Sequence, residues 1–133
     1  MKDLVIVVAC ALIDRDRRVL IAQRKMGGLN GGLWEFPGGK IEHGETPEQA
    51  IIRELKEELD IETQSACLAP LSFVSHAYDK FHLLMPLYIC RKWQGEPEAL
   101  EHIELKWVRA NRLRDYEMIK ADIPLIAPLR DLL

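Results

Sequence analysis

An amphipathic helix with clear start signals lies near the middle of the chain. Thr46 is suited to the N-cap, Pro47 to the first helical position, and Gln49 completes a capping box with Thr46. Apolar residues then recur at helical spacing, at Ala50, Ile51, Leu55 and Leu59. The sequence therefore predicts a helix from Thr46 to about Leu59 that packs one face against a core.

Segments typical of β-strands lie on both sides of this helix. They are Leu4–Ile13, Arg18–Gln23, Leu68–Ser75, Lys80–Lys92 and Leu105–Val108, with a short apolar stretch at Leu33–Phe36 and a final short helix at Leu125–Leu132. The first strand is continuously apolar and is expected to be buried on both faces, and its charged turn predicts a hairpin with the second strand. Strands on both sides of a central helix indicate an α/β or α+β sandwich, expected as one domain over residues 1–133.

The predicted helix also carries three glutamates on a second face. Glu54, Glu57 and Glu58 stand at positions i, i+3 and i+4, which places their carboxylates side by side. Like charges at this spacing repel one another unless a cation lies among them. Mg²⁺ prefers oxygen ligands and would bridge such carboxylates to substrate phosphates, whereas a simple solvated acidic face is the alternative interpretation.

A second charged pair flanks the helix start. Glu45 precedes the N-cap and Arg53 lies two turns along the helix, so a charge-assisted hydrogen bond between them would fix the preceding segment. That segment, residues 38–44, is expected to be a loop in which Gly38, Gly39 and Gly44 let the backbone approach an ion or a phosphate.

Taken together, these residues resemble the Nudix box, G-x5-E-x7-R-E-U-x-E-E-x-G-U, where U is aliphatic. The matching positions are Gly39, Glu45, Arg53, Glu54, Leu55, Glu57, Glu58 and Ile61. One position departs from the pattern, because Asp60 replaces the late glycine. That glycine ends the helix in a left-handed conformation, which aspartate tolerates at modest cost.

The resemblance extends to the MutT-like subgroup of the Nudix family. It includes Trp34-Glu35-Phe36-Pro37, Trp93-Gln94-Gly95-Glu96-Pro97 and Ala121-Asp122-Ile123-Pro124, and so covers nearly the whole chain. The resemblance implies the Nudix fold, a mixed β-sheet sandwiched between helices.

The same resemblance implies a hydrolase in which water attacks the β-phosphorus of a nucleoside triphosphate and nucleoside monophosphate leaves. Glu54, Glu57, Glu58 and the Gly39 carbonyl are the implied ligands of Mg²⁺, with Mn²⁺ as an alternative ion. Lys40 is a candidate to bind a phosphate oxygen, and a solvated surface lysine is the competing interpretation.

In MutT-like proteins a glutamate after the Gly-Glu-Pro turn can reach the metal site, and the resemblance implies the same after Gly95-Glu96-Pro97 here. Its spacing from Pro97 favours Glu101 as general base and further metal ligand, with Glu98 and Glu104 as competitors. Glu54 is another candidate to orient or deprotonate the water.

Three positions match residues that surround the nucleobase in MutT-like proteins: Arg24, Phe36 and Asp122. Phe36 would form an apolar wall, Arg24 offers donors to a base oxygen, and Asp122 accepts hydrogen bonds from a base. The alternatives are a surface charge for Arg24, core packing for Phe36 and a helix cap for Asp122.

Composition narrows the partners. A net charge of −3 over 133 residues gives no excess of positive charge for a nucleic-acid polymer, so a small nucleotide is the expected partner. Cys10, Cys67 and Cys90 show no paired spacing, which indicates a reducing compartment. The apolar run Leu4–Ile13 is too short to span a membrane, so we expect a cytoplasmic protein, either monomer or homodimer.

The histidines His43, His76, His82 and His102 have no ligand spacing and are expected in structural or surface roles, although His43 lies in the Nudix loop and could approach substrate.

The leading functional hypothesis is hydrolysis of 8-oxo-dGTP, which would clean the nucleotide pool and prevent mutation. Within the same family, the alternatives are a pyrophosphohydrolase of CTP, methylated dCTP or other triphosphates, and a sugar-nucleotide or dinucleotide hydrolase. A catalytically silent nucleotide-binding module is a further alternative, but such modules lose box glutamates and this chain keeps all of them. The remaining alternative is an acidic scaffold protein without catalytic activity, in which the match to the motif is coincidental.

Overall fold

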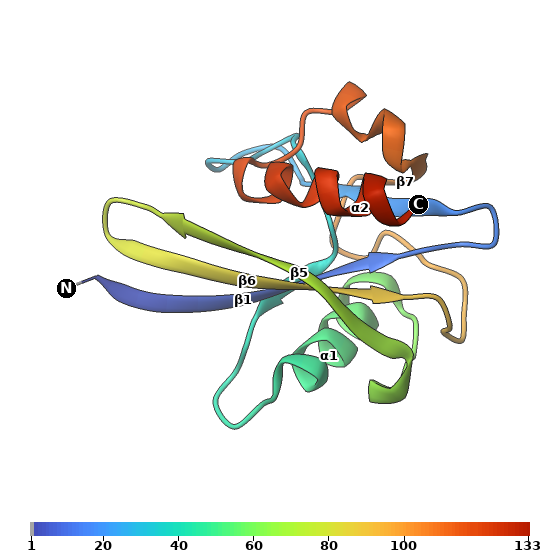
Figure 1. Cartoon of the computed structure of the whole chain (residues 1–133), viewed down its shortest axis with the longest axis horizontal. Coiled ribbons are helices and arrows are strands. Elements are labelled where there is room, and N and C mark those ends of the chain that lie inside the picture. The colour runs from blue at the N-terminus through green and yellow to red at the C-terminus, as the bar shows by residue number, and fades with distance from the viewer. Residues whose placement is uncertain (1) are drawn as a thin grey trace.

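The computed structural model describes residues 2–133 and has a central mixed sheet with helices on both faces (Figure 1). The strands are β1 (Asp3–Leu12), β2 (Arg18–Gln23), β3 (Trp34–Glu35), β4 (Gly38–Lys40), β5 (Leu68–Ala77), β6 (Phe81–Cys90) and β7 (Glu104–Arg109). The α-helices are α1 (Pro47–Leu59) and α2 (Ile126–Leu132), and the 3-10 helices are η1 (Ser65–Cys67), η2 (Ala110–Asp115) and η3 (Lys120–Leu125). The predicted mixed α/β (α+β) architecture is confirmed.

The strands form two sheets. The larger sheet has the order β4-β1-β6-β5, in which β1 runs parallel to β6 and antiparallel to β4. The smaller sheet has the order β3-β2-β7 and is antiparallel throughout. Figure 1 shows α1 on one face of the larger sheet and α2 on the other, so this sheet is the middle layer.

The predicted hairpin between the first two strands is wrong beyond its base. Asp14–Arg17 does form the turn, and one bridge joins Ile13 to Val19. Beyond that bridge β1 and β2 enter different sheets, because both edges of β1 are already occupied by β4 and β6.

Burial along β1 also differs from the prediction. Its first half is mostly exposed, with Leu4 at 59% exposure, and only its second half is buried on both faces. There Val8, Cys10 and Leu12 pack toward α1, whereas Ala9 and Ala11 pack into the core beneath α2. The continuous apolar pattern therefore predicts burial correctly only for the second half of β1, which is covered by helices on both faces.

Helix α1 follows its sequence signals closely. The Thr46 side chain accepts from the Gln49 amide and the Gln49 side chain accepts from the Thr46 amide, which completes the capping box. At the other end Asp60 adopts the left-handed conformation with φ 56°, as expected for the residue that replaces the family's glycine. The Asp60 carboxylate pairs with Lys56 at 2.8 Å.

The segment expected to be a glycine loop contains a strand. Gly38–Lys40 forms β4, which pairs with β1 in the register Val8 to Gly39. Glycine weakens a strand locally, but here it permits close contact: a Cβ at Gly38 would lie 2.0 Å from the Val8 carbonyl oxygen.

Replacing Gly38 by alanine should therefore destabilise the protein by about 2 kcal/mol, because β4 must move away from β1. Urea unfolding measures the effect. Gly44→Ala is an informative comparison, because a Cβ there meets no atom within 4 Å, although its φ of 83° adds backbone strain. A Gly38→Ala variant as stable as the wild type would contradict the proposed close packing.

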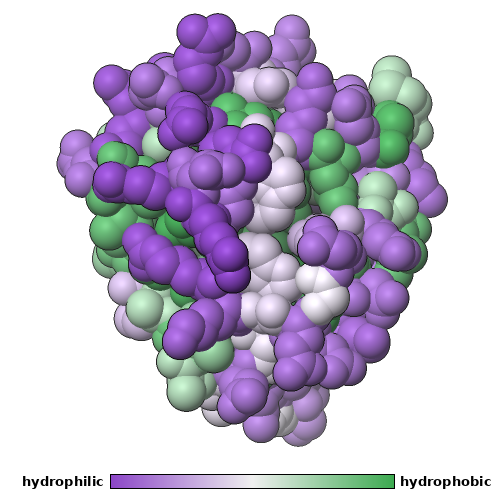
Figure 2. Space-filling model, turned by 90° about the vertical axis from the view of Figure 1, so that its right-hand side faces the viewer, coloured by the Kyte–Doolittle hydropathy of each residue, from purple (hydrophilic) through white to green (hydrophobic). Residues whose placement is uncertain are grey.

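The face of the molecule shown in Figure 2 is mostly hydrophilic, and its hydrophobic side chains form separate patches. Scattered apolar residues of this kind are normal on a folded domain. Within residues 2–133, no helix has the length and apolar character needed to cross a bilayer.

Candidate active site

Four segments that are distant in sequence meet around an acidic cleft of about 360 Å³. Helix α1 supplies Glu54 and Glu58, β3 supplies Glu35, and the loop before β7 supplies Glu101 and His102. Arg24, Lys25, Met26, Gly27 and Gly38 complete the lining. Backbone hydrogen bonds from Leu100 to Glu58 and from Ile103 to Gln23 fix the loop against both α1 and β2.

The glutamates of α1 have very different environments. The side chain of Glu58 is 4% exposed and that of Glu54 is 15% exposed, whereas Glu57 is 50% exposed and does not line the cleft. The expected shared face is thus confirmed for Glu54 and Glu58. Glu57 lies outside the cleft, where its carboxylate accepts a hydrogen bond from the Arg53 guanidinium at 3.3 Å.

Glu58 is a buried carboxylate with little compensation. Its Oε2 accepts from the Gly38 amide at 3.1 Å, but no lysine or arginine among residues 2–133 forms an ion pair with it. Burial, reinforced by the neighbouring Glu54, raises the pKa of Glu58 well above its usual value. A cation in the cleft would remove this penalty.

Gly39 gives a second indication that the site suits a cation with oxygen ligands. A Cβ at this position would lie 2.6 Å from the Glu54 carboxylate, so glycine is what lets the backbone and this carboxylate approach each other. The Glu54 carboxylate thus lies close against the Gly39 backbone, and carboxylate and backbone oxygens are the ligand types that hard divalent cations prefer. The residues present therefore fit a divalent metal ion.

The expected pair between Glu45 and Arg53 is present. Arg53 donates to the two Glu45 carboxylate oxygens at 2.7 and 2.9 Å, and also to Glu54 at 2.7 Å. It donates further to the Lys40 carbonyl at 3.0 Å, which ties the Nudix segment to the helix. The hydrogen bond to Arg53 lowers the pKa of Glu45, and the same bond raises the pKa of Arg53.

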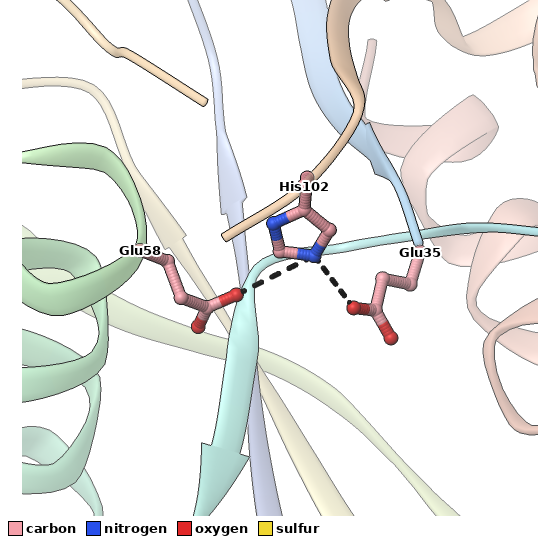
Figure 3. Close-up of side chains that lie close together, drawn as sticks. All are labelled: Glu35, Glu58 and His102. Atoms are coloured by element: carbon pink, nitrogen blue, oxygen red, sulfur yellow. Dashed lines mark hydrogen bonds and ion pairs between the residues drawn. The ribbon is translucent and has the colours of Figure 1, made fainter. Parts of the chain in front are cut away.

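Two side chains of the cleft that can bind a metal ion were not predicted from the sequence: Glu35 and His102. The His102 ring is 5% exposed, with Nε2 2.8 Å from a Glu35 carboxylate oxygen and 3.7 Å from a Glu58 oxygen (Figure 3). The structure places His102 inside the acidic cleft and away from the surface. The sequence signal that could have placed His102 in the cleft is its position directly after Glu101.

Of the three candidates for the general base that follow Pro97, Glu101 alone lines the acidic cleft, and the further candidate Glu54 lines it from α1. Glu98 precedes it in the exposed part of the same loop, and Glu104 begins β7. Geometry thus favours Glu101 among these three residues.

A second, more apolar cleft of about 380 Å³ adjoins the first and shares Arg24, Glu35 and Gly38 with it. Its lining includes all four positions expected around substrate, together with two further aromatic residues. The four are Arg24, Phe36, Lys40 and Asp122, and the aromatic residues are Tyr78 and Phe81. Phe36 is 3% exposed and belongs to the core as well, so it serves both packing and the wall of the cleft.

Asp122 is 2% exposed, and its carboxylate accepts from the Phe36 amide at 2.9 Å. It makes no cap to the following helix, since neither η3 nor α2 has a side-chain cap. Burial raises the pKa of Asp122 to about 8, and Glu35 contributes in the same direction. Arg24, expected near the base, pairs with Glu35 at 3.0 Å.

The architecture and the cleft agree with what comparison to known proteins finds. The model of the NUDIX domain family matches residues 8–127, so the chain belongs to the Nudix family and is a Nudix hydrolase of nucleotide substrates. Within that family the chain is MutT-like. The 8-oxo-dGTP diphosphatase of Escherichia coli is 33% identical over 132 residues, covering 99% of this chain and 100% of that protein.

Two further relatives refine this placement. The CTP pyrophosphohydrolase of Escherichia coli is 38% identical over 122 residues, covering 90% of this chain and 87% of that protein. A solved MutT structure, from work on the Aliivibrio salmonicida and Vibrio cholerae proteins, aligns with TM-score 0.82 and 28% identity. That alignment covers 98% of this chain and 100% of the other.

Proposed function

We propose that the chain is a Mg²⁺-dependent nucleoside triphosphate pyrophosphohydrolase whose substrate is 8-oxo-dGTP, acting in nucleotide-pool sanitation in the cytoplasm. The observation that carries the proposal is the pair of adjoining clefts, one acidic and one apolar, with a shared wall at Arg24, Glu35 and Gly38. A nucleotide with its triphosphate in the first and its base in the second fits this arrangement. The proposal treats residues 1–133 as one catalytic domain.

The ligands proposed for the ion are Glu54, Glu58 and Glu101 of the acidic cleft, together with Glu57 beside it and the Gly39 carbonyl of the adjoining cleft, with Mn²⁺ as the alternative ion. When bound, the ion supplies Lewis-acid screening of the phosphate charge. Arg53 holds Glu54 in place through its 2.7 Å contact, and Glu45 fixes Arg53 in turn.

The bond changes follow from this placement. Glu101 accepts a proton as the water oxygen forms a bond to the β-phosphorus, and the bond from that phosphorus to the α–β bridging oxygen breaks. Nucleoside monophosphate leaves with the bridging oxygen, and pyrophosphate is the second product. Lys40, exposed at the edge of the second cleft, can donate to a phosphate oxygen.

A hydrolysis panel tests the substrate. It compares 8-oxo-dGTP, the ordinary dNTPs, CTP, 5-methyl-dCTP and ADP-ribose with Mg²⁺, scoring kcat/KM and product identity. We expect the highest kcat/KM for 8-oxo-dGTP, with pyrophosphate released. No turnover of any triphosphate would overturn the proposal and favour a nucleotide-binding module.

A second candidate is a CTP or methylated dCTP pyrophosphohydrolase. It is supported by the 38% identity to a protein named CTP pyrophosphohydrolase. Asp122 is compatible with either base, since it can accept a hydrogen bond from the cytosine amino group as well as from guanine. A preference for a pyrimidine triphosphate in the same panel would select this candidate and keep the mechanism.

Asp122→Asn should reduce the pH dependence of stability. The pKa of Asp122 in the folded protein is raised to about 8, above its value in the unfolded chain. Its contribution to the free energy of unfolding is therefore fully present at low pH and is lost as pH rises through the folded-state pKa. Asparagine keeps an acceptor for the Phe36 amide but does not ionise. Between about pH 4 and 8 the free energy of unfolding of the variant should therefore rise relative to that of the wild type, by at most about 1.4 kcal/mol per pH unit.

Urea unfolding at several pH values with EDTA measures this difference. Asp115→Asn is the control, because Asp115 lies on the surface in an ion pair with Arg112. Parallel stability profiles for wild type and Asp122→Asn would mean that Asp122 is ionised in the folded protein.

A further inference from the structure

His102 occupies a position that the hydrolytic mechanism above does not use. Figure 3 shows its ring between Glu58 of α1 and Glu35 of β3, with Nε2 directed at both carboxylates. One ligand atom from each of the three side chains lies within 4.8 Å of the others. Three elements distant in sequence thus bring one nitrogen and two carboxylates to a single point.

The burial of this cluster indicates that it is more than a surface ion pair. His102 is 8% exposed and Glu58 is 3% exposed, so both are withdrawn from solvent. The other ring nitrogen, Nδ1, has no hydrogen-bond partner in the part of the chain that the structure describes. The Glu35 carboxylate can only accept, so in the metal-free protein Nε2 carries the ring proton and donates it to Glu35. A cation bound at Nε2 would take the place of that proton, and Nδ1 is free of any competing hydrogen bond within residues 2–133.

The charges around the cluster are unbalanced. Arg24 pairs with Glu35 at 3.0 Å, and Arg53 pairs with Glu54, but no arginine or lysine within residues 2–133 pairs with Glu58. Two carboxylates and a neutral imidazole form a donor set in which a divalent ion would supply the missing positive charge. Imidazole nitrogen favours transition-metal ions over Mg²⁺, whose ligands are oxygens.

We propose that Glu35, Glu58 and His102 bind a divalent transition-metal ion through the His102 Nε2 nitrogen and one oxygen from each glutamate. This inference rests on the proposed metal-dependent function, because it shares Glu58 with the proposed Mg²⁺ ligands. It adds a nitrogen ligand and Glu35 to the oxygen ligands proposed there. The consequence is a selectivity for Mn²⁺ over Mg²⁺ that a site of oxygen ligands alone would not have.

Pulsed electron paramagnetic resonance with Mn²⁺ tests the nitrogen ligand without any turnover. The nucleotide-free protein receives one equivalent of Mn²⁺, and ¹⁴N modulation from a directly bound imidazole is expected. His102→Gln should remove this modulation. His82→Gln is the matched control, because His82 lies on β6 beside Ser75 and should leave the modulation unchanged.

Affinity provides a second readout. His102→Gln should weaken Mn²⁺ binding by about tenfold, whereas Mg²⁺ binding, measured by competition, should change by less than about twofold. Glu35→Gln should also weaken Mn²⁺ binding. If His102→Gln lost equal affinity for Mn²⁺ and Mg²⁺, the cleft would be disrupted in general and the proposed selectivity for Mn²⁺ would be wrong.

The two proposals fail separately. Absence of ¹⁴N modulation in wild-type protein that has bound Mn²⁺ overturns the nitrogen site, even if triphosphates are hydrolysed with Mg²⁺. Clear modulation in a protein that hydrolyses no triphosphate supports the metal site and overturns the proposed hydrolytic function.

Discussion

Glu58→Gln should lower kcat/KM at least about 10³-fold and, in the same protein, raise the stability of the metal-free state. The carboxylate is 3% exposed, and burial together with Glu54 disfavours its charge. Glutamine keeps the size of the side chain and an acceptor for the Gly38 amide but carries no charge. We therefore expect the metal-free variant to gain about 1 kcal/mol or more.

Two measurements on one preparation check this pair of effects. Hydrolysis with Mg²⁺ gives kcat/KM, and denaturant unfolding with EDTA near neutral pH gives the free energy of unfolding. Glu62→Gln is the matched control, since Glu62 is an exposed glutamate near Lys56 and should change neither quantity. A Glu58→Gln variant that loses stability would mean that the charged carboxylate is already compensated in the metal-free protein.

Arg53→Ala should produce the second large effect. Arg53 is the only arginine or lysine within residues 2–133 that forms ion pairs with Glu45, Glu54 and Glu57, and its side chain is 21% exposed. Its loss leaves these carboxylates to repel one another and releases the Lys40 carbonyl. We expect a loss of about 2–3 kcal/mol without metal and a fall in kcat of about 10²-fold or more.

Added Mg²⁺ should restore part of the stability of Arg53→Ala, because a bound cation also neutralises the glutamates. Arg53→Lys should recover little activity, since lysine cannot reproduce the paired hydrogen bonds to Glu45. Arg18→Ala is the control, because Arg18 forms comparable pairs with Asp14 and Asp16 outside the cleft. An Arg53→Ala variant with wild-type kcat would exclude this positioning role.

Several features of the site could be predicted because they depend on residues close together in sequence. The capping box of Thr46 and Gln49 and the left-handed Asp60 follow from helical geometry within α1. The pairing of Glu45 with Arg53 spans only two helical turns. Local spacing of this kind determines which side chains share a helix face.

Other features depended on strand pairing and could not be predicted. The segment Gly38–Lys40 looks like a loop, but it forms β4 because β1 offers a free edge there. The same competition for edges separates β1 from β2 after their turn. Which strands pair is decided by the packing of the whole sheet, and the pattern of any single strand does not encode it.

The sequence by itself therefore determined the helix, the order of its glutamates and the family to which the chain belongs. Only the tertiary structure brought His102 to Glu35, 67 residues away, and placed both beside Glu58. The physical reason is that the loop before β7 docks on the end of α1 and on β2 through backbone hydrogen bonds. Every residue except proline can donate such a backbone hydrogen bond, so the pattern of side chains in the sequence does not predict where these bonds form.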